Sequence, residues 1–148
     1  MQNNYQKVII FTDGACKRNP GPGGWAGILN YENKQKIVKG YSPNTTNNIM
    51  ELTAVIKSLD ILKRKCDVVI TTDSNYVKDG ITKWINNWKI NGWKTANKKP
   101  VKNKALWIEL DQQKNKHHIT WKWVKGHSGN PMNELADQMA NLAIDENL

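Results

Sequence analysis

The sequence contains little cysteine and no long hydrophobic segment. Cys16 and Cys66 are the only two cysteines among 148 residues, and they form no Cys-x-x-Cys motif. Neither a disulfide framework nor a zinc site is therefore predicted, and a reducing compartment fits best. No apolar run approaches the length that spans a membrane, and the polar residues 1–7 do not resemble a signal peptide. We expect a monomeric cytoplasmic protein whose residues 1–148 form a single domain.

Arginine is also scarce, although the chain is strongly basic. The formal net charge is +9, and among 22 basic residues only Arg18 and Arg64 are arginines. A basic surface favours a polyanionic partner such as nucleic acid or an anionic membrane surface. Lysine binds phosphates as a point charge, whereas arginine is the side chain that forks onto guanine edges. We therefore expect phosphate contacts with little sequence preference. The alternative is that the lysine content only reflects genome composition, since asparagine is also abundant.

Two apolar, β-rich runs are each followed by an aspartate. Residues 8–11 precede Asp13, and residues 68–70 precede Asp73. A helix is predicted between the two runs, so the strands are parallel neighbours joined by a right-handed crossover. Active sites of open α/β sheets form at the carboxyl ends of such strands, which makes both aspartates candidate catalytic residues. For Asp13 alone the alternative is a turn cap, because Asp-Gly is a common turn dipeptide.

The helix between these strands carries a third candidate acid. Apolar residues recur at helical spacing after the capping residues 45–48, namely Leu52, Val55, Ile56, Leu59 and Leu62. Glu51 lies at the edge of this apolar stripe. The alternative is a capping box, in which the Glu51 carboxylate returns to the backbone amide of Asn48.

Short strands and a glycine-rich stretch precede that helix. Residues 15–24 predict a loop because proline and glycine punctuate them, and the Gly-Lys-Ser/Thr ending of a phosphate-binding P-loop is absent. Residues 25–31 and 36–41 predict two strands. With these short connections, the first three strands are expected to form an antiparallel meander.

A basic, aromatic segment occupies the middle of the chain. No acid occurs between Asp79 and Glu109, where seven lysines do, and Trp84, Trp88 and Trp93 are interleaved with them. Lysines pair with phosphates and flat rings pack against sugars, so this composition is typical of a nucleic-acid groove. For Trp84 and Trp88 the alternative is that the rings simply belong to the core.

The C-terminal part adds two further candidates. Residues 105–110 predict a helix, residues 118–124 a last strand, and residues 134–143 a last helix. His127 falls in the glycine-containing loop before that helix, and Asp137 lies in its first turns. The alternatives are an exposed loop histidine for His127, and for Asp137 a favourable charge near a helix N-terminus.

The motifs follow one another in an order that resembles a known family. They are residues 12–16 (TDGAC), 19–24 (NPGPGG), 45–52 (TTNNIMEL), 72–74 (TDS), 76–77 (YV), 80–81 (GI), Trp84, 92–94 (GWK) and 124–127 (VKGH). Together they resemble bacterial type 1 ribonuclease H over nearly the whole chain. The resemblance implies an α/β, ribonuclease H-like fold, with a five-stranded mixed sheet of three antiparallel strands plus parallel strands, flanked by helices on both faces. It implies an endoribonuclease that hydrolyses the RNA strand of RNA–DNA hybrids, leaves 3′-hydroxyl and 5′-phosphate ends, and has no membrane partner.

The same resemblance implies the catalytic groups. Asp13, Glu51, Asp73 and Asp137 are implied as metal ligands, and His127 as a further catalytic residue. Mg²⁺, with Mn²⁺ as the alternative ion, prefers hard carboxylate oxygens. Two ions roughly 4 Å apart stabilise both the attacking and the leaving oxygen of a phosphodiester. His127, with an unperturbed pKa of about 6.5, suits a proton shuttle.

The resemblance also implies the substrate contacts. The groove that recognises the 2′-hydroxyl is implied to be lined by Cys16, Asn19, Asn47, Asn48 and Asn75. Carboxamides suit this task because they both donate and accept hydrogen bonds. Thr46 and Asn87 are implied to hold a phosphate of the DNA strand. The residues implied to clasp that strand are Trp84, Trp88, Lys89, Trp93, Lys94, Lys98 and Lys99.

Three residues depart from those common in bacterial relatives. They are Lys17, Arg18 and Asn75, and they affect the expected substrate affinity more than the expected chemistry. Two other readings stay open. Integrases, transposases and Holliday-junction resolvases share this architecture and acid cluster but act on DNA. A non-catalytic hybrid-binding module is the third reading, and the full set of four acids argues against it.

Overall fold

Five strands form one mixed sheet in the order β3-β2-β1-β4-β5. The computed structural model describes residues 5–125 and 129–148. Its strands are β1 (Gln6–Cys16), β2 (Gly21–Tyr31), β3 (Lys34–Thr45), β4 (Cys66–Thr72) and β5 (His118–Trp123). The pairs β1–β2 and β2–β3 are antiparallel, and β1–β4 and β4–β5 are parallel. The predicted meander and the predicted parallel pairing of the two aspartate-ended strands are both confirmed.

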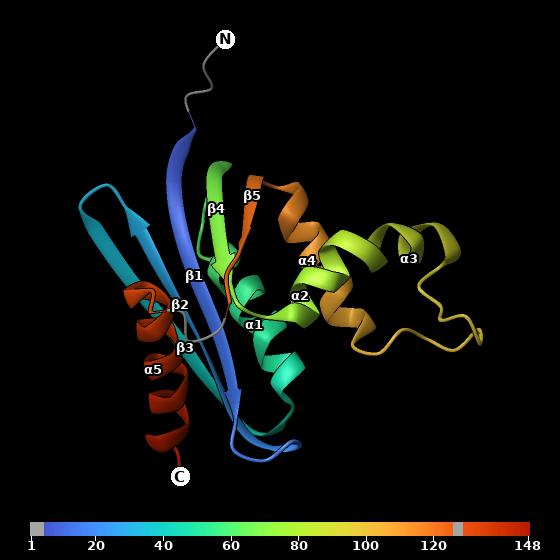
Figure 1. The fold of residues 1–148 in the computed structure, drawn as a ribbon. Coiled ribbons are helices and arrows are strands. Elements are labelled where there is room, and N and C mark those ends of the chain that lie inside the picture. Colours follow the sequence, from blue (N-terminus) through green and yellow to red (C-terminus); the bar gives the residue numbers. More distant parts are fainter. Residues whose placement is uncertain (1–4, 126–128) are drawn as a thin grey trace.

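Helices cover both faces of this sheet (Figure 1). They are α1 (Asn47–Asp60), α2 (Asn75–Asp79), the π-helix η1 (Gly80–Trp84), α3 (Ile85–Asn91), α4 (Lys104–Asn115) and α5 (Pro131–Asp145). The helix α1 packs on β1 and β2 from one side with α4 beside it, and α5 packs on β1, β2 and β3 from the other. The predicted five-stranded mixed sheet with helices on both faces is therefore confirmed. Within the described residues, no helix is long and apolar enough to cross a membrane.

The main core lies between the sheet and α1. Val8 and Ile10 of β1 point toward the α1 stripe and are at most 3% exposed. Their neighbour Ile9 points to the opposite face and is 44% exposed. The continuous apolar run at residues 8–11 predicts a strand that is buried on both faces, and this prediction is wrong at Ile9. An apolar run does not show whether a second layer covers both faces along the whole strand.

The strand β1 also continues beyond Asp13. Its parallel pairing with β4 ends at Phe11, but its antiparallel pairing with β2 continues to Cys16. The loop predicted over residues 15–24 is therefore confined to residues 17–20. Asp13 still lies just past the last residue that pairs with β4, so it remains at the sheet edge where β4 ends.

Two glycines of β2 let helices approach the strand from both sides. A Cβ at Gly24 would lie 2.2 Å from the carbonyl oxygen of Ala140 in α5, and one at Gly27 would lie 1.9 Å from Ser58 Oγ in α1. No side chain fits at either contact. Gly24 falls in the predicted loop and Gly27 in the predicted strand 25–31, and both serve close packing in a central strand.

A buried histidine links the start of β4 to the end of α4. His117 is only 8% exposed, and its Nδ1 atom accepts a hydrogen bond of 3.1 Å from the backbone N–H of Cys66. Burial lowers the pKa of His117, and the positive charges of Lys116 and Lys65 lower it further. A protonated Nδ1 cannot accept a hydrogen bond, so the folded state holds the neutral form.

Mild acid is expected to destabilise the protein through His117. Its folded-state pKa lies below the unfolded value of about 6.5, so its contribution is present above that pH and is lost as the pH falls through the folded pKa. His117→Leu should flatten this pH dependence. It should also cost about 1–3 kcal/mol at neutral pH, because the Cys66 N–H loses its acceptor. Urea unfolding at several pH values measures both effects. The comparison variant is His118→Leu at the exposed neighbour, which loses a 2.9 Å surface contact with Asp67 Oδ1 but leaves the Cys66 N–H its acceptor. An unchanged slope in His117→Leu would contradict this role.

Candidate active site

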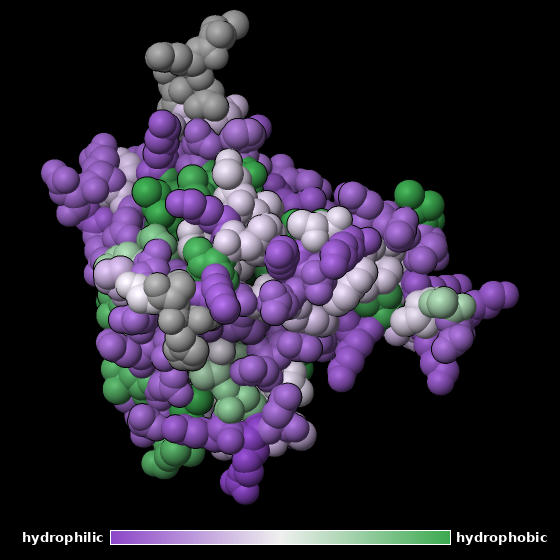
Figure 2. Space-filling model, viewed as in Figure 1, coloured by the Kyte–Doolittle hydropathy of each residue, from purple (hydrophilic) through white to green (hydrophobic). Residues whose placement is uncertain are grey.

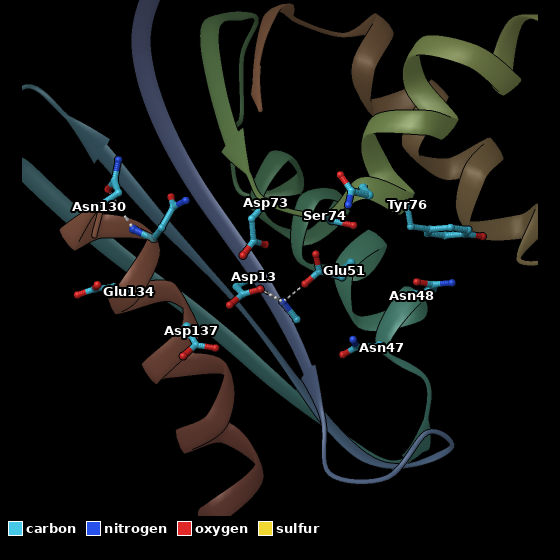
Figure 3. A pocket seen from close by; sticks show the side chains of 13 residues that line it. Asp13, Asn47, Asn48, Glu51, Asp73, Ser74, Tyr76, Asn130, Glu134 and Asp137 are labelled. Atoms are coloured by element: carbon cyan, nitrogen blue, oxygen red, sulfur yellow. Dashed lines mark hydrogen bonds between the residues drawn. The ribbon is translucent and has the colours of Figure 1, made fainter. Parts of the chain in front are cut away.

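Three carboxylates from distant parts of the chain converge at one edge of the sheet (Figure 3). Asp13 comes from β1, Glu51 from α1, and Asp73 directly follows β4. One ligand oxygen of each lies within 4.8 Å of the others. The structure thus brings together three of the four predicted acids, as the parallel pairing of β1 and β4 requires.

The backbone of Gly14 holds two of these acids. Its N–H donates to Asp13 Oδ1 at 2.9 Å and also to the Glu51 carboxylate. Thr46 caps α1, because its Oγ1 accepts a 3.2 Å hydrogen bond from the Ile49 N–H. The capping-box alternative for Glu51 is therefore wrong, since this carboxylate turns toward β1 and not to the start of its own helix.

Gly14 is also the point where β1 and α1 come closest. A Cβ at this position would lie 2.6 Å from the backbone nitrogen of Glu51. Gly14→Ala should push α1 away from β1, cost about 1–3 kcal/mol of stability, and displace Glu51 from Asp13. Misplacement on this scale lowers turnover by roughly 10²-fold in enzymes. Thermal melting with steady-state kinetics tests this, and wild-type turnover in the alanine variant would show that the spacing is not needed.

The carboxylates cannot all ionise freely at neutral pH. Burial raises the pKa of Asp13 to about 7, with further contributions from the charges of Asp73 and Asp137, although a hydrogen bond with Glu51 opposes the shift. Burial and the Asp13 charge raise the pKa of Glu51 well above its usual range. A cluster of this kind needs a cation to become fully charged, and its all-oxygen donor set fits a hard divalent ion.

The first turns of α5 form the opposite wall of this pocket. Asp137 faces the three acids from α5, and Glu134 lines the same pocket one turn earlier (Figure 3). Asn130, which caps α5, and Asn133 line it as well. Glu134 and these two asparagines were not predicted. The sequence signal for Glu134 is its i, i+3 spacing from Asp137, which places both residues on one helix face.

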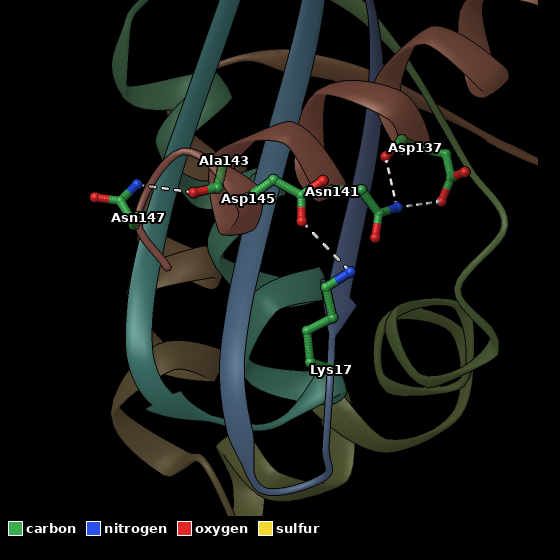
Figure 4. A network of polar contacts seen from close by, with 6 residues as sticks. All are labelled: Lys17, Asp137, Asn141, Ala143, Asp145 and Asn147. Carbon is green, nitrogen blue, oxygen red and sulfur yellow. Dashed lines mark hydrogen bonds and ion pairs between the residues drawn. The ribbon is translucent and has the colours of Figure 1, made fainter.

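A polar network holds Asp137 and the end of α5 (Figure 4). The Asn141 Nδ2 atom donates to the Asp137 backbone oxygen at 2.9 Å and to its Oδ1 at 3.3 Å. Lys17 forms an ion pair of 3.5 Å with Asp145, between two exposed side chains. Lys17 therefore has a structural partner on α5. The predicted catalytic residue His127 lies outside the described residues.

Most of the predicted asparagines surround the acids. Asn47, Asn48 and Asn75 line the same pocket. Asn19 is not among the residues that line the pocket, but it supports Asn47, because its Oδ1 accepts a 3.1 Å hydrogen bond from the Asn47 N–H. The Cys16 thiol is turned toward the backbone, 2.5 Å from the carbonyl oxygen of Arg18. Of these five predicted groove residues, three reach the pocket and two support its rim.

The basic arm, defined as residues 80–104, projects from the body of the protein (Figure 1) and has a largely hydrophilic surface (Figure 2). Trp88 lies at its base, with ring centroids 5.7 Å from Trp84, 6.1 Å from Trp93 and 5.5 Å from Trp107. Trp88 and Trp93 pack against the main core, while Trp84 contacts Tyr76 and Trp88. The alternative that the Trp88 ring belongs to the core is therefore confirmed in part.

The predicted lysines of the arm differ in their surroundings. Lys89 forms an ion pair of 3.3 Å with Asp111 of α4. Lys94, Lys98 and Lys99 are exposed, and within the described residues none of them pairs with a carboxylate. These three lysines are therefore the ones available to an external anion, together with the exposed side chain of Asn87.

The chain resembles known proteins over nearly its whole length. The RNase H family model matches residues 5–145. A ribonuclease H from Francisella tularensis subsp. novicida (strain U112) is 61% identical over 140 residues, which are 95% of this chain and 92% of that protein.

Solved structures show the same likeness. LC9-RNase H1, a type 1 RNase H with the type 2 active-site motif, has a TM-score of 0.89 at 33% identity, over 100% of this chain and 76% of that chain. LC11-RNase H1, solved in complex with an RNA/DNA hybrid, has a TM-score of 0.73 at 23% identity, over 94% of this chain and 97% of that chain, and supports the fold alone. Because the family model matches residues 5–145 and a curated relative is 61% identical over 95% of the chain, the chain belongs to the ribonuclease H family.

Proposed function

We propose that this protein is an endoribonuclease that hydrolyses the RNA strand of RNA–DNA hybrids with little sequence preference. The observation that carries the proposal is the convergence of Asp13, Glu51 and Asp73 within 4.8 Å in a chain of the ribonuclease H family. A structural role does not explain this cluster, because its mutual repulsion destabilises the fold unless a cation neutralises it. We further propose that residues 1–148 form one monomeric, cytoplasmic domain.

The proposed cofactor is Mg²⁺, with Mn²⁺ as the alternative ion. Asp13, Glu51 and Asp73 would hold it, and Asp137 faces them from α5. Two such ions, when bound, would supply Lewis-acid stabilisation during hydrolysis, and the proposed products carry a 3′-hydroxyl and a 5′-phosphate. The Gly14 N–H orients the first two carboxylates, and the Asn141 amide orients Asp137.

Proton transfer is assigned to His127. This residue falls in the sequence between β5 and α5 and outside the described residues. An imidazole with a pKa of about 6.5 exchanges protons at neutral pH, so it can accept a proton from the attacking water or deliver one to the leaving oxygen.

Recognition of RNA is assigned to the asparagines beside the acids. Asn47, Asn48 and Asn75 line the pocket, and a carboxamide can accept from and donate to a 2′-hydroxyl at the same time. The Asn19 oxygen is occupied by the Asn47 N–H, which leaves its amide N–H₂ as a donor. Cys16 supports the turn beside them.

Binding of the DNA strand is assigned to two other groups of residues. The Thr46 hydroxyl caps α1 through its oxygen and keeps its hydrogen for a phosphate, with Asn87 as the second proposed phosphate ligand. The basic arm supplies the remaining proposed contacts, through Trp84, Trp88, Lys89, Trp93, Lys94, Lys98 and Lys99.

Removal of three predicted arm lysines that have no ion-pair partner among the described residues is expected to weaken binding more than catalysis. The triple variant Lys94→Ala, Lys98→Ala and Lys99→Ala should raise the Michaelis constant while turnover changes little, because the acid cluster lies elsewhere. The plot of log affinity against log salt should flatten by roughly 0.7–0.9 for each phosphate that the variant no longer neutralises. Anisotropy titrations of a labelled hybrid in Ca²⁺ give this slope.

A matched control separates arm contacts from net charge. Lys57, Lys63 and Lys116 are exposed lysines outside the arm. Changing these three to alanine alters the total charge equally and should leave the salt slope at the wild-type value. If the arm variant keeps the wild-type slope as well, Lys94, Lys98 and Lys99 do not contact phosphates.

A panel of labelled substrates tests the proposed function. Wild-type protein with Mg²⁺ should cut only the RNA strand of an RNA–DNA hybrid, and should leave duplex DNA and duplex RNA intact. Cleavage of duplex DNA at a similar rate would favour the integrase-like reading. Tight hybrid binding without cleavage under any divalent ion would favour a binding module.

A further inference from the structure

A second cleft lies beside the acid-lined pocket. It opens where β4 and β5 end, and its lining includes Lys78 of α2, Trp123 of β5, and Lys125 just after β5. The two cavities share Asp73, Ser74 and Asn75 as a common wall. A nucleic-acid strand that crosses the acids and passes Asn75 therefore enters this second cleft directly.

The topology of the sheet creates this cleft. Thr72 and Trp123 are the last register partners of the parallel pair β4–β5, and the Val124 N–H still donates to the Thr72 oxygen at 3.1 Å. Beyond this point one segment turns into α2, which starts at the end of β4 (Figure 1), and the other continues to Lys125. Divergence of two parallel strands at their carboxyl ends is the arrangement that forms ligand sites in open α/β sheets.

The walls of the cleft suit a nucleotide phosphate. Lys78 and Lys125 are both exposed, and neither pairs with a carboxylate within residues 5–125 and 129–148. Trp123 stacks on Trp121 with ring centroids 5.4 Å apart and an interplanar angle of 7°, which fixes the indole as an apolar wall. Two ammonium groups beside a fixed aromatic ring match one phosphate and its adjoining sugar.

The electrostatics of the neighbouring pocket call for such groups. Asp13, Glu51, Asp73, Glu134 and Asp137 line one cavity, and the negative charge they carry without bound cations repels an approaching nucleic-acid backbone. The basic arm is assigned to the DNA strand, so it does not offset this repulsion along the RNA strand. Lysines in the adjoining cleft would attract the RNA strand next to the acids.

We propose that this cleft binds the RNA-strand phosphate adjacent to the scissile one, with Lys78 and Lys125 as its ligands. The inference rests on the proposed function, because it names a contact made by the same substrate. The two lysines hold the strand in register across the acids, and they take no part in the chemical step.

The test combines the double variant Lys78→Ala and Lys125→Ala with substrates in which one phosphate at a time is replaced by an uncharged linkage. The substrate is a hybrid whose RNA strand is 2′-O-methylated except for one short cleavable stretch, so that the position of cleavage is fixed. A series of such hybrids carries one uncharged methylphosphonate linkage, each following a 2′-O-methyl nucleotide and each matched by the same hybrid with an ordinary phosphate. A parallel series carries the uncharged linkage in the DNA strand.

We expect the lysine substitutions and one neutral RNA linkage to have non-additive effects on the Michaelis constant. The double variant should raise the Michaelis constant for the unmodified hybrid by about fivefold, the scale expected for exposed ion pairs, with turnover nearly unchanged. In wild type, neutralising one RNA linkage next to the scissile phosphate should cause a similar rise. In the double variant the same neutral linkage should have no further effect, since the lysines that would bind the charged phosphate are already absent.

The outcomes separate this inference from the proposed function. If wild type fails to cut the unmodified hybrid, the proposed function itself is wrong. If wild type cuts but every neutral linkage has the same effect in both proteins, or if only a DNA-strand linkage is coupled, the assignment of the cleft is wrong. Lys57→Ala with Lys63→Ala is the matched control and should show no coupling. The variant Lys78→Gln with Lys125→Gln keeps part of each alkyl stem without the charge, and its agreement with the alanine variant argues against a packing effect.

Discussion

Replacing Asp13 by asparagine is expected to abolish cleavage of an RNA–DNA hybrid while leaving hybrid binding largely intact. Asp13 lies at the centre of the acid cluster, within reach of both Glu51 and Asp73. A carboxamide adds no negative charge, so the cluster should lose divalent-ion affinity and with it several kcal/mol of transition-state stabilisation. A loss of that size lowers turnover by roughly 10³-fold or more. Single-turnover cleavage with Mg²⁺ measures the chemistry, and anisotropy in Ca²⁺ measures binding.

A second variant controls for the loss of one negative charge. Asp60→Asn makes the same chemical change at the far end of α1, where Asp60 accepts a 3.0 Å hydrogen bond from Gln113 that an amide oxygen can also accept. This variant should cleave the hybrid at the wild-type rate. Substantial cleavage by Asp13→Asn would remove the cluster from the mechanism.

The same substitution is expected to stabilise the protein when no metal is present. The folded-state pKa of Asp13 is about 7, whereas its ordinary value is 3.8. Because the pKa is raised on folding, the folded protein binds the proton more tightly, and stability falls as the pH rises between these two values. Above the folded pKa the penalty reaches on the order of 4 kcal/mol for this group alone. In EDTA, Asp13→Asn should therefore melt above wild type at alkaline pH, by on the order of 10 °C.

Two comparisons isolate this effect. At a pH below the ordinary pKa of aspartate both proteins should melt at similar temperatures in EDTA, since Asp13 is then protonated in both the folded and the unfolded state. Addition of millimolar Mg²⁺ should raise the melting temperature of wild type through preferential binding to the folded state, and should raise that of Asp13→Asn much less. The pH dependence from His117 is common to both proteins and cancels. A variant that melts below wild type at alkaline pH in EDTA would show that repulsion within the cluster is small.

The order of strands and the meeting of the acids were predictable from local patterns. Two β-rich runs with a helix between them dictate a parallel pair, and this pair brings Asp13 and Asp73 to one edge. The contribution of Glu51 does not follow from local pattern alone, because an isolated helix also offers it a capping role. Only the close approach of Gly14 to α1 turns that carboxylate toward β1, and the approach depends on tertiary packing.

The remaining differences arise where packing overrides local signals. The glycine-rich residues 21–24 have the composition of a loop, yet they lie in β2, where Gly24 allows α5 to approach the strand directly. Glu134 and Asn133 belong to the pocket only because α5 lies across β1, and helical spacing alone does not show which wall a helix face meets. The exposed Ile9 shows the opposite case, where α5 leaves part of an apolar strand uncovered.

The most direct test of metal-dependent RNA hydrolysis is to follow a 5′-labelled RNA strand in a hybrid and determine the ends of its fragments. Cleavage should stop when EDTA is added and resume when excess Mg²⁺ is restored. The fragments should end in a 3′-hydroxyl, so that a DNA polymerase extends them along the DNA strand without prior phosphatase treatment. Cleavage that continues in EDTA would contradict the account. Fragments ending in a 2′,3′-cyclic phosphate would contradict it as well, since they would show that the RNA's own 2′-hydroxyl was the nucleophile.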